Sequence, residues 1–326
     1  MGHTQMNKEQ FYNIVSKSDK GLVQSLANYH NQIKRCLLIK AITLLNSPSK
    51  GQRMINNIKM IDFGMGQGGD ISKWGEDKNI KRVFGIDISK DDLKTAYDRY
   101  NGIKKKKGRL PRNDNDIMFM HGNIGLDMNL NTQPELVRKL DKFTDSQNGY
   151  FDIANCQFVL SHLFGSNDTL NTFIENVYNN LKAGGIFIIT TLNGEKVKEL
   201  LNDETDYSAK KDNKILWAFN YTDKTTNKIK SMIITIGNKF MSEYLTDIDK
   251  FIELCSHKFE VLHNKSFNDI EYLTKHSSNF QFYKDASTYL TKLNKDYYEN
   301  TNNNNNIENY NAIYSNLHNY IILKRK

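Results

Sequence analysis

A glycine-rich turn between two short apolar runs is the feature that most constrains how this chain can fold. Residues 59–63 form the first run, which leads directly into Gly64, Gly66 and Gly68. A helix-like stretch follows, and the second run, residues 83–87, ends in an acid. An apolar strand, a glycine turn, a helix and a second apolar strand, in this order, indicate a βαβ unit. Because a βαβ unit builds a parallel sheet, we expect an α/β fold.

The glycine turn also points to a ligand. Glycines let the backbone approach a bound molecule closely, and the amides at a helix N-terminus are free to donate hydrogen bonds to it. Asp87 ends the second run, where a carboxylate can accept hydrogen bonds from two ribose hydroxyls. Alone, this pattern suits a nicotinamide dinucleotide, a flavin or S-adenosylmethionine, or it is only a tight structural turn.

Three features favour S-adenosylmethionine and therefore a methyltransferase. Asp62 lies directly before the glycines, where its carboxylate can orient the zwitterionic amino-acid part of the donor. The glycine turn follows a long helical preamble instead of opening the chain. Residues 151–164, FDIANCQFVLSHLF, fit the fourth strand with which methyltransferases floor the donor site. A nicotinamide-dependent oxidoreductase remains as an alternative that rests on the glycine turn alone.

Strands and helices continue to alternate along the chain, which predicts a mostly parallel sheet covered by helices on both faces. Helical spacing of apolar residues over 8–45 predicts two or three amphipathic helices before the sheet. An antiparallel hairpin is expected from 215–221 and 230–236, inserted after the core strands. The remaining expected strands are 117–120, 151–158, 186–192, 259–261 and 320–323, and the remaining expected helices are 91–100, 169–181 and 245–257.

Composition indicates a folded protein with an anionic partner. The 326 residues include 45 Lys and Arg against 37 Asp and Glu, a net charge of +8, and 11% of them are aromatic. The three cysteines lie apart, so neither a disulfide framework nor a zinc cluster is expected. No apolar stretch is long enough to span a membrane, and the N-terminus lacks the apolar core of a signal peptide, so we expect a cytoplasmic protein. The basic run 104–112 is a candidate RNA contact.

Several short motifs, taken together and in order, resemble the mRNA cap guanine-N7 methyltransferases. They span about 31–323, nearly the whole chain. They are HNQIK at 30–34, FGMGQGGD at 63–70, GID at 85–87, NCQF at 155–158, GGIFI at 184–188 with LNG at 192–194, and EYL at 243–245. The resemblance implies a Rossmann-like class I methyltransferase fold and transfer of the methyl group of S-adenosylmethionine to N7 of the guanine in a GpppRNA cap. S-adenosylhomocysteine would be the second product.

The resemblance also implies roles for individual residues. Residues matching the donor site, which would bind the cofactor, are Lys34, Asp62, Gly64, Gly66, Gly68, Asp87, Asn123 and Gln157. Residues matching the cap site, which would bind the substrate, are Asn31, Arg99, Ser161, His162, Glu243 and Tyr320. Glu243 matches the acid that accepts from N1–H and the exocyclic amine of guanine. No general base is expected, because N7 carries a free lone pair, and orientation falls to Glu243, His162 and Tyr320. No metal site is expected.

Three positions depart from the family pattern. Gln67 stands where the family has a lysine in the glycine loop, which leaves Lys34 to supply the cation near the donor carboxylate. Asn123 replaces an acid that contacts the adenine amine, and Ser161 with His162 replaces a His-Tyr pair. These departures keep open a second reading, a non-catalytic cap- or RNA-binding module derived from the enzyme.

We expect one elaborated methyltransferase domain over 51–326, with a helical extension over 1–50 that contributes to the active site and an Asn-rich loop at 300–306. Capped RNA is the expected partner. Triphosphatase and guanylyltransferase domains on the same polypeptide, or a stimulatory subunit, are further partners that the resemblance implies. The Asn bias and the resemblance together favour a viral or cytoplasmic capping system. The positive charge is expected to gather around Lys34, Arg99 and the run 104–112.

Overall fold

The computed structural model describes residues 24–46, 55–75, 79–105, 117–144, 151–211, 214–233, 241–275, 281–298 and 307–326. The expected helices before residue 24, most of the basic run 104–112 and the Asn-rich loop 300–306 lie outside these residues. None of the described helices is long and apolar enough to cross a membrane.

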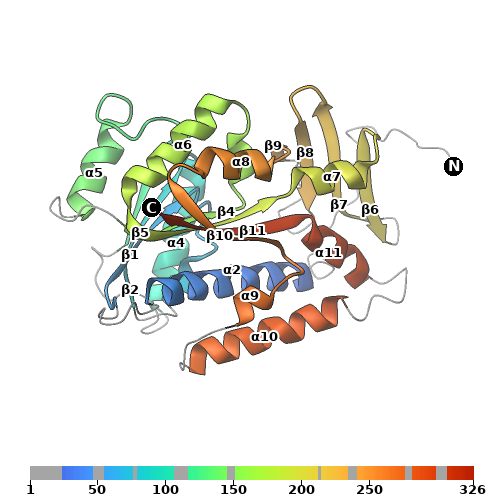
Figure 1. Cartoon of the computed structure of the whole chain (residues 1–326), viewed down its shortest axis with the longest axis horizontal. Helices are drawn as coiled ribbons and strands as arrows, with labels where there is room; N and C mark the ends of the chain where they lie inside the picture. Colours follow the sequence, from blue (N-terminus) through green and yellow to red (C-terminus); the bar gives the residue numbers. More distant parts are fainter. Residues whose placement is uncertain are drawn as a thin grey trace.

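The central feature is a seven-stranded sheet with the order β10-β11-β5-β4-β1-β2-β3 (Figure 1). The strands are β1 (Ile58–Phe63), β2 (Ile80–Asp87), β3 (Ile117–His121), β4 (Phe151–Gln157), β5 (Leu181–Leu192), β10 (Phe259–Ser266) and β11 (His318–Arg325). The first five strands are parallel, and β11 pairs antiparallel with both β5 and β10. This order confirms the predicted mostly parallel sheet. The chain reverses direction across the sheet between β1 and β4, and ligands bind beyond the carboxyl ends of strands at such a switch point.

Helices cover both faces of the sheet (Figure 1). One face packs against α2 (Gln24–Leu45), α3 (Ile71–Trp74), α4 (Lys90–Lys105), α9 (Glu271–Thr274) and α10 (Gln281–Tyr298). The other face packs against α5 (Pro134–Thr144), α6 (Asn167–Asn180) and α8 (Ile248–Cys255). Successive strand residues point to opposite faces, so Tyr320 and Ile322 of β11 lie in the first core and Ile321 and Leu323 in the second.

A second, antiparallel sheet has the order β6-β7-β8-β9. Its strands are β6 (Asp206–Lys211), β7 (Lys214–Asp223), β8 (Lys228–Ile233) and β9 (Met241–Tyr244). The predicted hairpin is therefore the β7–β8 pair, and the two strands that flank it, β6 and β9, were not predicted. One face of this sheet buries Trp217, Phe219 and Ile229 against α7 (Gly194–Leu201) and α11 (Ile307–Asn316), where Tyr314 completes the cluster.

The end of the helix expected over 169–181 and the start of the next strand lie closer together than the sequence suggests. Helix α6 ends at Asn180, and β5 already begins at Leu181, ahead of the pair Gly184-Gly185. Gly184 has φ +75° within an irregular start of β5. The glycines therefore shape the strand rather than end the helix.

The loop after β3 is fixed by one buried asparagine of α6. The Asn176 amide donates to the carbonyl oxygens of Ile124 (3.0 Å) and Leu126 (2.8 Å), and its oxygen accepts from the Met128 N–H (3.0 Å). A second contact comes from Gln133, whose side chain exchanges two hydrogen bonds with the backbone of Asn123. The loop that carries Asn123 is thus held at both ends.

Replacing Asn176 by alanine should lower the free energy of unfolding by about 2–3 kcal/mol, because it removes three hydrogen bonds to the backbone of the loop. The Leu126 carbonyl would keep its bond from Gln133, but the bonds to Ile124 and Met128 would be lost. Asn171→Ala, at an exposed position of the same helix, should change it by less than about 0.5 kcal/mol. Urea unfolding of both variants measures the difference. Equal stabilities for the two would contradict the role of Asn176.

Candidate active site

Two neighbouring cavities lie at the carboxyl ends of the parallel strands. The larger, of about 590 Å³, extends over the glycine turn and is called here the glycine-loop cavity. The smaller, of about 190 Å³, is called the Glu243 cavity. Phe158, His162 and Met241 line both. Molecules bound in the two cavities would therefore face each other across these three side chains.

The glycine turn adopts a backbone that other residues avoid. Gly64, Gly66 and Gly68 have φ of +75°, +52° and +70°. A Cβ on Gly64 would lie 2.6 Å from a Val159 methyl group, so this position also lacks room for a side chain. The turn needs glycine for its backbone conformation and, at Gly64, for space.

Asp87 fixes the turn from the end of β2. Its carboxylate accepts from the N–H of Gly66 (2.7 Å) and from the N–H of Ser89 (2.8 Å). Asp87 lines the glycine-loop cavity, and each carboxylate oxygen retains a lone pair beyond these bonds. It can therefore accept further hydrogen bonds from a diol. Asn123 lines the same cavity, with its side-chain oxygen accepting from the Gly125 N–H (2.9 Å).

A chain of side-chain hydrogen bonds crosses the strands beneath this cavity. The Thr190 hydroxyl donates to Gln157 (2.9 Å), the Gln157 amide donates to Asn155 (2.6 Å), and the Asn155 amide donates to Asp62 (2.7 Å). Asp62 is buried, and desolvation together with the nearby Asp70 carboxylate raises its pKa to about 7. The chain fixes the orientation of Asp62 and Gln157, which both line the cavity.

Two lysines share one carboxylate beside the same cavity. The ammonium groups of Lys34 and Lys73 each lie 2.7 Å from Asp70, and Lys73 also donates to Asn31 (2.9 Å). Burial opposes ionisation of Asp70, but the two ammonium groups outweigh it and hold the pKa of that carboxyl well below its usual range. Lys34 lines the cavity, whereas Gln67 is exposed, does not line it, and donates to the Asp92 carboxylate (2.9 Å). Lys34 is thus the cation available there among the described residues.

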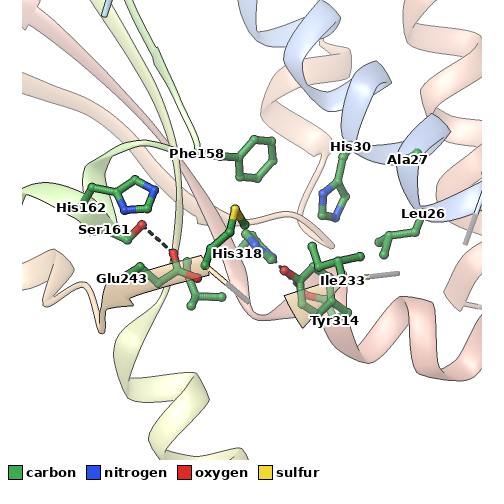
Figure 2. A pocket seen from close by; sticks show the side chains of 12 residues that line it. Leu26, Ala27, His30, Phe158, Ser161, His162, Ile233, Glu243, Tyr314 and His318 are labelled. Atoms are coloured by element: carbon green, nitrogen blue, oxygen red, sulfur yellow. Dashed lines mark hydrogen bonds between the residues drawn. The ribbon is translucent and has the colours of Figure 1, made fainter. Parts of the chain in front are cut away.

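The Glu243 cavity has aromatic walls (Figure 2). His30 of α2 stacks on Phe158 with ring centroids 5.5 Å apart, and Tyr314 and His318 pack against the same group. Burial lowers the pKa of His318 to about 4 and the pKa of His30 well below its ordinary value. Both imidazoles are therefore neutral near pH 7 and act as polar aromatic walls.

Glu243 is the acid of this cavity and is buried on β9. Its two oxygens accept separately, one from the Ser161 hydroxyl (2.7 Å) and one from the Ser231 hydroxyl. Burial, and then the Glu243 charge, raise the pKa of Tyr314 well above its ordinary value. No ion pair joins Glu243 to a cation within the described residues. The cavity therefore presents one uncompensated anion among aromatic rings.

The structure brings most of the predicted site residues together. The glycine-loop cavity contains Lys34, Asp62, Gly64, Gly66, Asp87, Asn123, Gln157 and His162, and the Glu243 cavity contains Ser161, His162 and Glu243. Gly68 belongs to the turn but lines neither cavity. Asn31 is an exposed residue that contacts Lys73, and Arg99 is exposed with its guanidinium near Gly69. The side chains of the basic run 104–112 lie outside the described residues.

Tyr320 does not join the site, although it was expected there. It is fully buried in the core beneath the sheet, its hydroxyl donates to the Asp269 carbonyl (2.8 Å), and its ring packs near His263. The reason is its register: Tyr320 pairs with Thr190, two residues deeper in the sheet than the pair His318 and Leu192 at the cavity.

The Glu243 cavity is also lined by four residues for which no role was predicted: His30, Phe158, Tyr314 and His318. His30 and Phe158 stand inside motifs that were recognised, so their positions were signalled although their roles were not. Tyr314 and His318 carry no local signal, because only the packing of α11 and β11 against α2 brings them to the cavity.

Comparison with known proteins gives a family. A family model described as the mRNA (guanine-N(7))-methyltransferase domain matches residues 3–313. The mRNA cap guanine-N(7) methyltransferase of Cryptococcus neoformans is 27% identical over 68% of this chain and 34% of its own length. The probable mRNA-capping enzyme of Acanthamoeba polyphaga mimivirus is 26% identical over 60% of this chain and 18% of its own length. The chain thus spans about a third or less of these two relatives.

A solved structure confirms the fold class. The CcbJ methyltransferase from Streptomyces caelestis superposes with a TM-score of 0.51, covering 91% of this chain and 89% of its own. At 13% identity, this likeness is one of fold. The predicted Rossmann-like class I methyltransferase fold is confirmed.

The raised pKa of Asp62 predicts a pH-dependent stability. Unfolded aspartate titrates near pH 4, so the folded protein holds this proton more tightly, and the resulting stabilisation is full at acid pH and lost as the pH rises through about 7. Asp62→Asn cannot ionise. The free energy of unfolding of the variant, minus that of the parent, should therefore rise by about 1 kcal/mol per pH unit between about pH 5 and 7.

Urea unfolding of both proteins at several pH values in this window gives that difference. The histidines are common to both proteins and cancel. A difference that stays constant with pH would contradict a raised pKa at Asp62.

Proposed function

This chain belongs to the mRNA (guanine-N(7))-methyltransferase family, and on that basis we propose that it transfers the methyl group of S-adenosylmethionine to N7 of the guanine in a GpppRNA cap. The observation that carries the proposal is the meeting of the two cavities at Phe158, His162 and Met241. One cavity has the features of a nucleoside site, and the other has a buried acid among aromatic rings. Methyl transfer needs such a pair, open to each other.

The glycine-loop cavity fits the donor. The Asp87 carboxylate has lone pairs for the ribose hydroxyls, and the left-handed glycine turn lets the backbone approach the ligand closely. Lys34 offers a cation for the donor carboxylate, and Asp62 offers an oxygen for its ammonium. S-adenosylmethionine supplies a methyl group on a sulfonium when bound. This donor set supports the predicted cofactor, which family membership also favours.

The Glu243 cavity fits the guanine. Two carboxylate oxygens side by side match the N1–H and exocyclic amine of guanine, and adenine lacks this pair of donors. Flat aromatic side chains, Phe158 and Tyr314 among them, suit the faces of a purine ring. The neutral imidazoles of His30 and His318 add no positive charge that would repel a methylated, cationic guanine.

Catalysis then depends on the relative position of donor and guanine and on the electrostatic field between them. The N7 lone pair forms the new bond to the methyl carbon, the carbon–sulfur bond breaks, and its electron pair stays on sulfur. No proton leaves, so no general base is required. Positive charge moves from the donor to the guanine ring during this step, towards the Glu243 anion and the faces of Phe158 and Tyr314. The protein holds both partners in line and supplies a field that favours this shift.

The departures from the family pattern do not favour the non-catalytic alternative. Gln67 does not line the cavity, but Lys34 does, and Lys73 helps to hold the Asp70 carboxylate that Lys34 contacts. Asn123 keeps an oxygen at the position of the missing acid. Each chemical group that donor binding needs is present.

Incubation of the pure protein with labelled S-adenosylmethionine and GpppA should yield m7GpppA, identified by chromatography against an authentic standard. Transfer to a ribose hydroxyl would contradict the proposal. Binding of both ligands by folded protein without any transfer would support the non-catalytic module instead.

Two isosteric variants should separate the two cavities. Glu243→Gln should weaken GpppA binding by roughly 10-fold to 100-fold, because a charged acceptor is lost, and leave S-adenosylhomocysteine binding within about twofold. Asp87→Asn should do the reverse. Isothermal titration with each ligand measures both effects, and Glu260→Gln, at an exposed position of β10, is the matched control. Equal loss of both ligands in each variant would show that the assignment of the cavities is wrong.

A further inference from the structure

Glu243 is held by two serines that come from different parts of the fold. Ser161 lies on the 3-10 helix η3 (Leu160–Leu163), which follows β4 of the main sheet, and Ser231 lies on β8 of the second sheet. Both serines are buried, with 3% and 2% of their surface exposed. Each donates to a different oxygen of the carboxylate (Figure 2 shows the bond from Ser161). The carboxyl plane is therefore fixed from two sides.

The register of the second sheet explains the contact from Ser231. In the β8–β9 pair, Ser231 lies opposite Met241 and Ile229 lies opposite Glu243. Ser231 and Glu243 are thus diagonal neighbours on one face of the sheet, within reach of a side-chain contact. Ser242, between Met241 and Glu243, points to the other face and is exposed.

The hydrogen-bonding capacity of the carboxylate decides what the serines leave free. Each carboxylate oxygen has two lone pairs, and each serine occupies one lone pair of one oxygen. One lone pair on each oxygen remains. Because Glu243 lines the cavity, these two are the acceptors available to a ligand with two parallel N–H donors.

We propose that Ser161 and Ser231 are positioning residues that orient Glu243 for two-point recognition of guanine, and so determine its discrimination against hypoxanthine, which lacks the exocyclic amine. The inference rests on the proposed function and deepens it. Ser161, expected to bind substrate, acts through Glu243. Ser231 is a new assignment that no motif signalled. Without the serines the carboxylate can rotate, and it then accepts from N1–H alone as readily as from both donors.

A purely structural role for the serines predicts something else. The bond from Ser161 to Glu243 joins the second sheet to the main sheet, so its loss could loosen the cavity as a whole. A loosened cavity would weaken binding of guanine and hypoxanthine caps by the same factor. The ratio of the two affinities therefore separates orientation from packing.

The test is titration of GpppA and of its inosine counterpart, IpppA, onto the protein in the presence of S-adenosylhomocysteine. The parent should bind GpppA about tenfold more tightly than IpppA, as expected for one hydrogen bond to a charged group. Ser161→Ala and Ser231→Ala should each reduce this ratio about threefold, and the double variant should bring it to within about twofold of unity. Ser161→Thr retains a hydroxyl group and should keep the parent ratio of the affinities for GpppA and IpppA.

Controls keep the result interpretable. Ser242→Ala, on the opposite face of β9, should leave the ratio unchanged, and the affinity for S-adenosylhomocysteine should stay within about twofold in every variant as a check on folding. A double variant that binds both caps more weakly but keeps the parent ratio would overturn the inference.

Methyl transfer by the parent to GpppA is measured in parallel. Absence of transfer in the parent would refute the proposed function. The inference would still stand if the binding ratio collapsed as predicted, so the two failures are distinguishable.

Discussion

The left-handed backbone of Phe158 is the constraint on which the arrangement of the site depends. Phe158 follows β4 directly and has φ +60°, an unusual value for an aromatic residue. Such a conformation costs on the order of 1 kcal/mol and persists only where the surroundings enforce it. Here its N–H donates to the Thr190 carbonyl (2.9 Å), and its ring packs against His30, Phe267 and His318. The chain thereby turns out of the sheet and places the ring between the two cavities.

The electrostatics of the site follow from the same arrangement. In the glycine-loop cavity, Asp70 neutralises part of the charge of Lys34 and Lys73. Lys34 is thus held as a cation near Asp62, whose pKa is raised mainly by burial. In the Glu243 cavity, one buried acid, Glu243, faces uncharged aromatic side chains. The proposed reaction moves positive charge from the first cavity to the second. The electrostatic field between the two cavities therefore favours the movement of positive charge toward Glu243.

Much of the fold was predictable from local pattern. The strands on either side of the glycine turn, and the acid at the end of β2, follow from apolar runs and glycines that any parallel sheet of this kind needs. Helix α10 was not predicted, although Ala286, Leu290 and Leu293 repeat at helical spacing. The flanking strands β6 and β9 were not predicted either, because they are short and carry few apolar residues.

The residues of the glycine-loop cavity were more predictable from the sequence than those of the Glu243 cavity, for a physical reason. Asp62, the glycines and Asp87 come from one βαβ unit, so their sequence spacing fixes their geometry. The Glu243 cavity is lined by residues of α2, η3, β8, β9, α11 and β11, among others, so the packing of distant segments determines its geometry. The expectation for Tyr320 failed on this point, because strand register, not motif order, decides which residue of β11 reaches the cavity.

In the proposed complex, donor and guanine lie on either side of Phe158, in the two cavities that meet there. A crystal structure with S-adenosylhomocysteine and GpppA bound would test this arrangement. We expect the ribose on Asp87, the guanine edge on Glu243, and N7 about 5 Å from the donor sulfur, because in-line transfer needs room for the methyl carbon between them, about 3–3.5 Å from N7. A guanine bound away from Glu243, or with its ribose hydroxyl facing the sulfur, would contradict it.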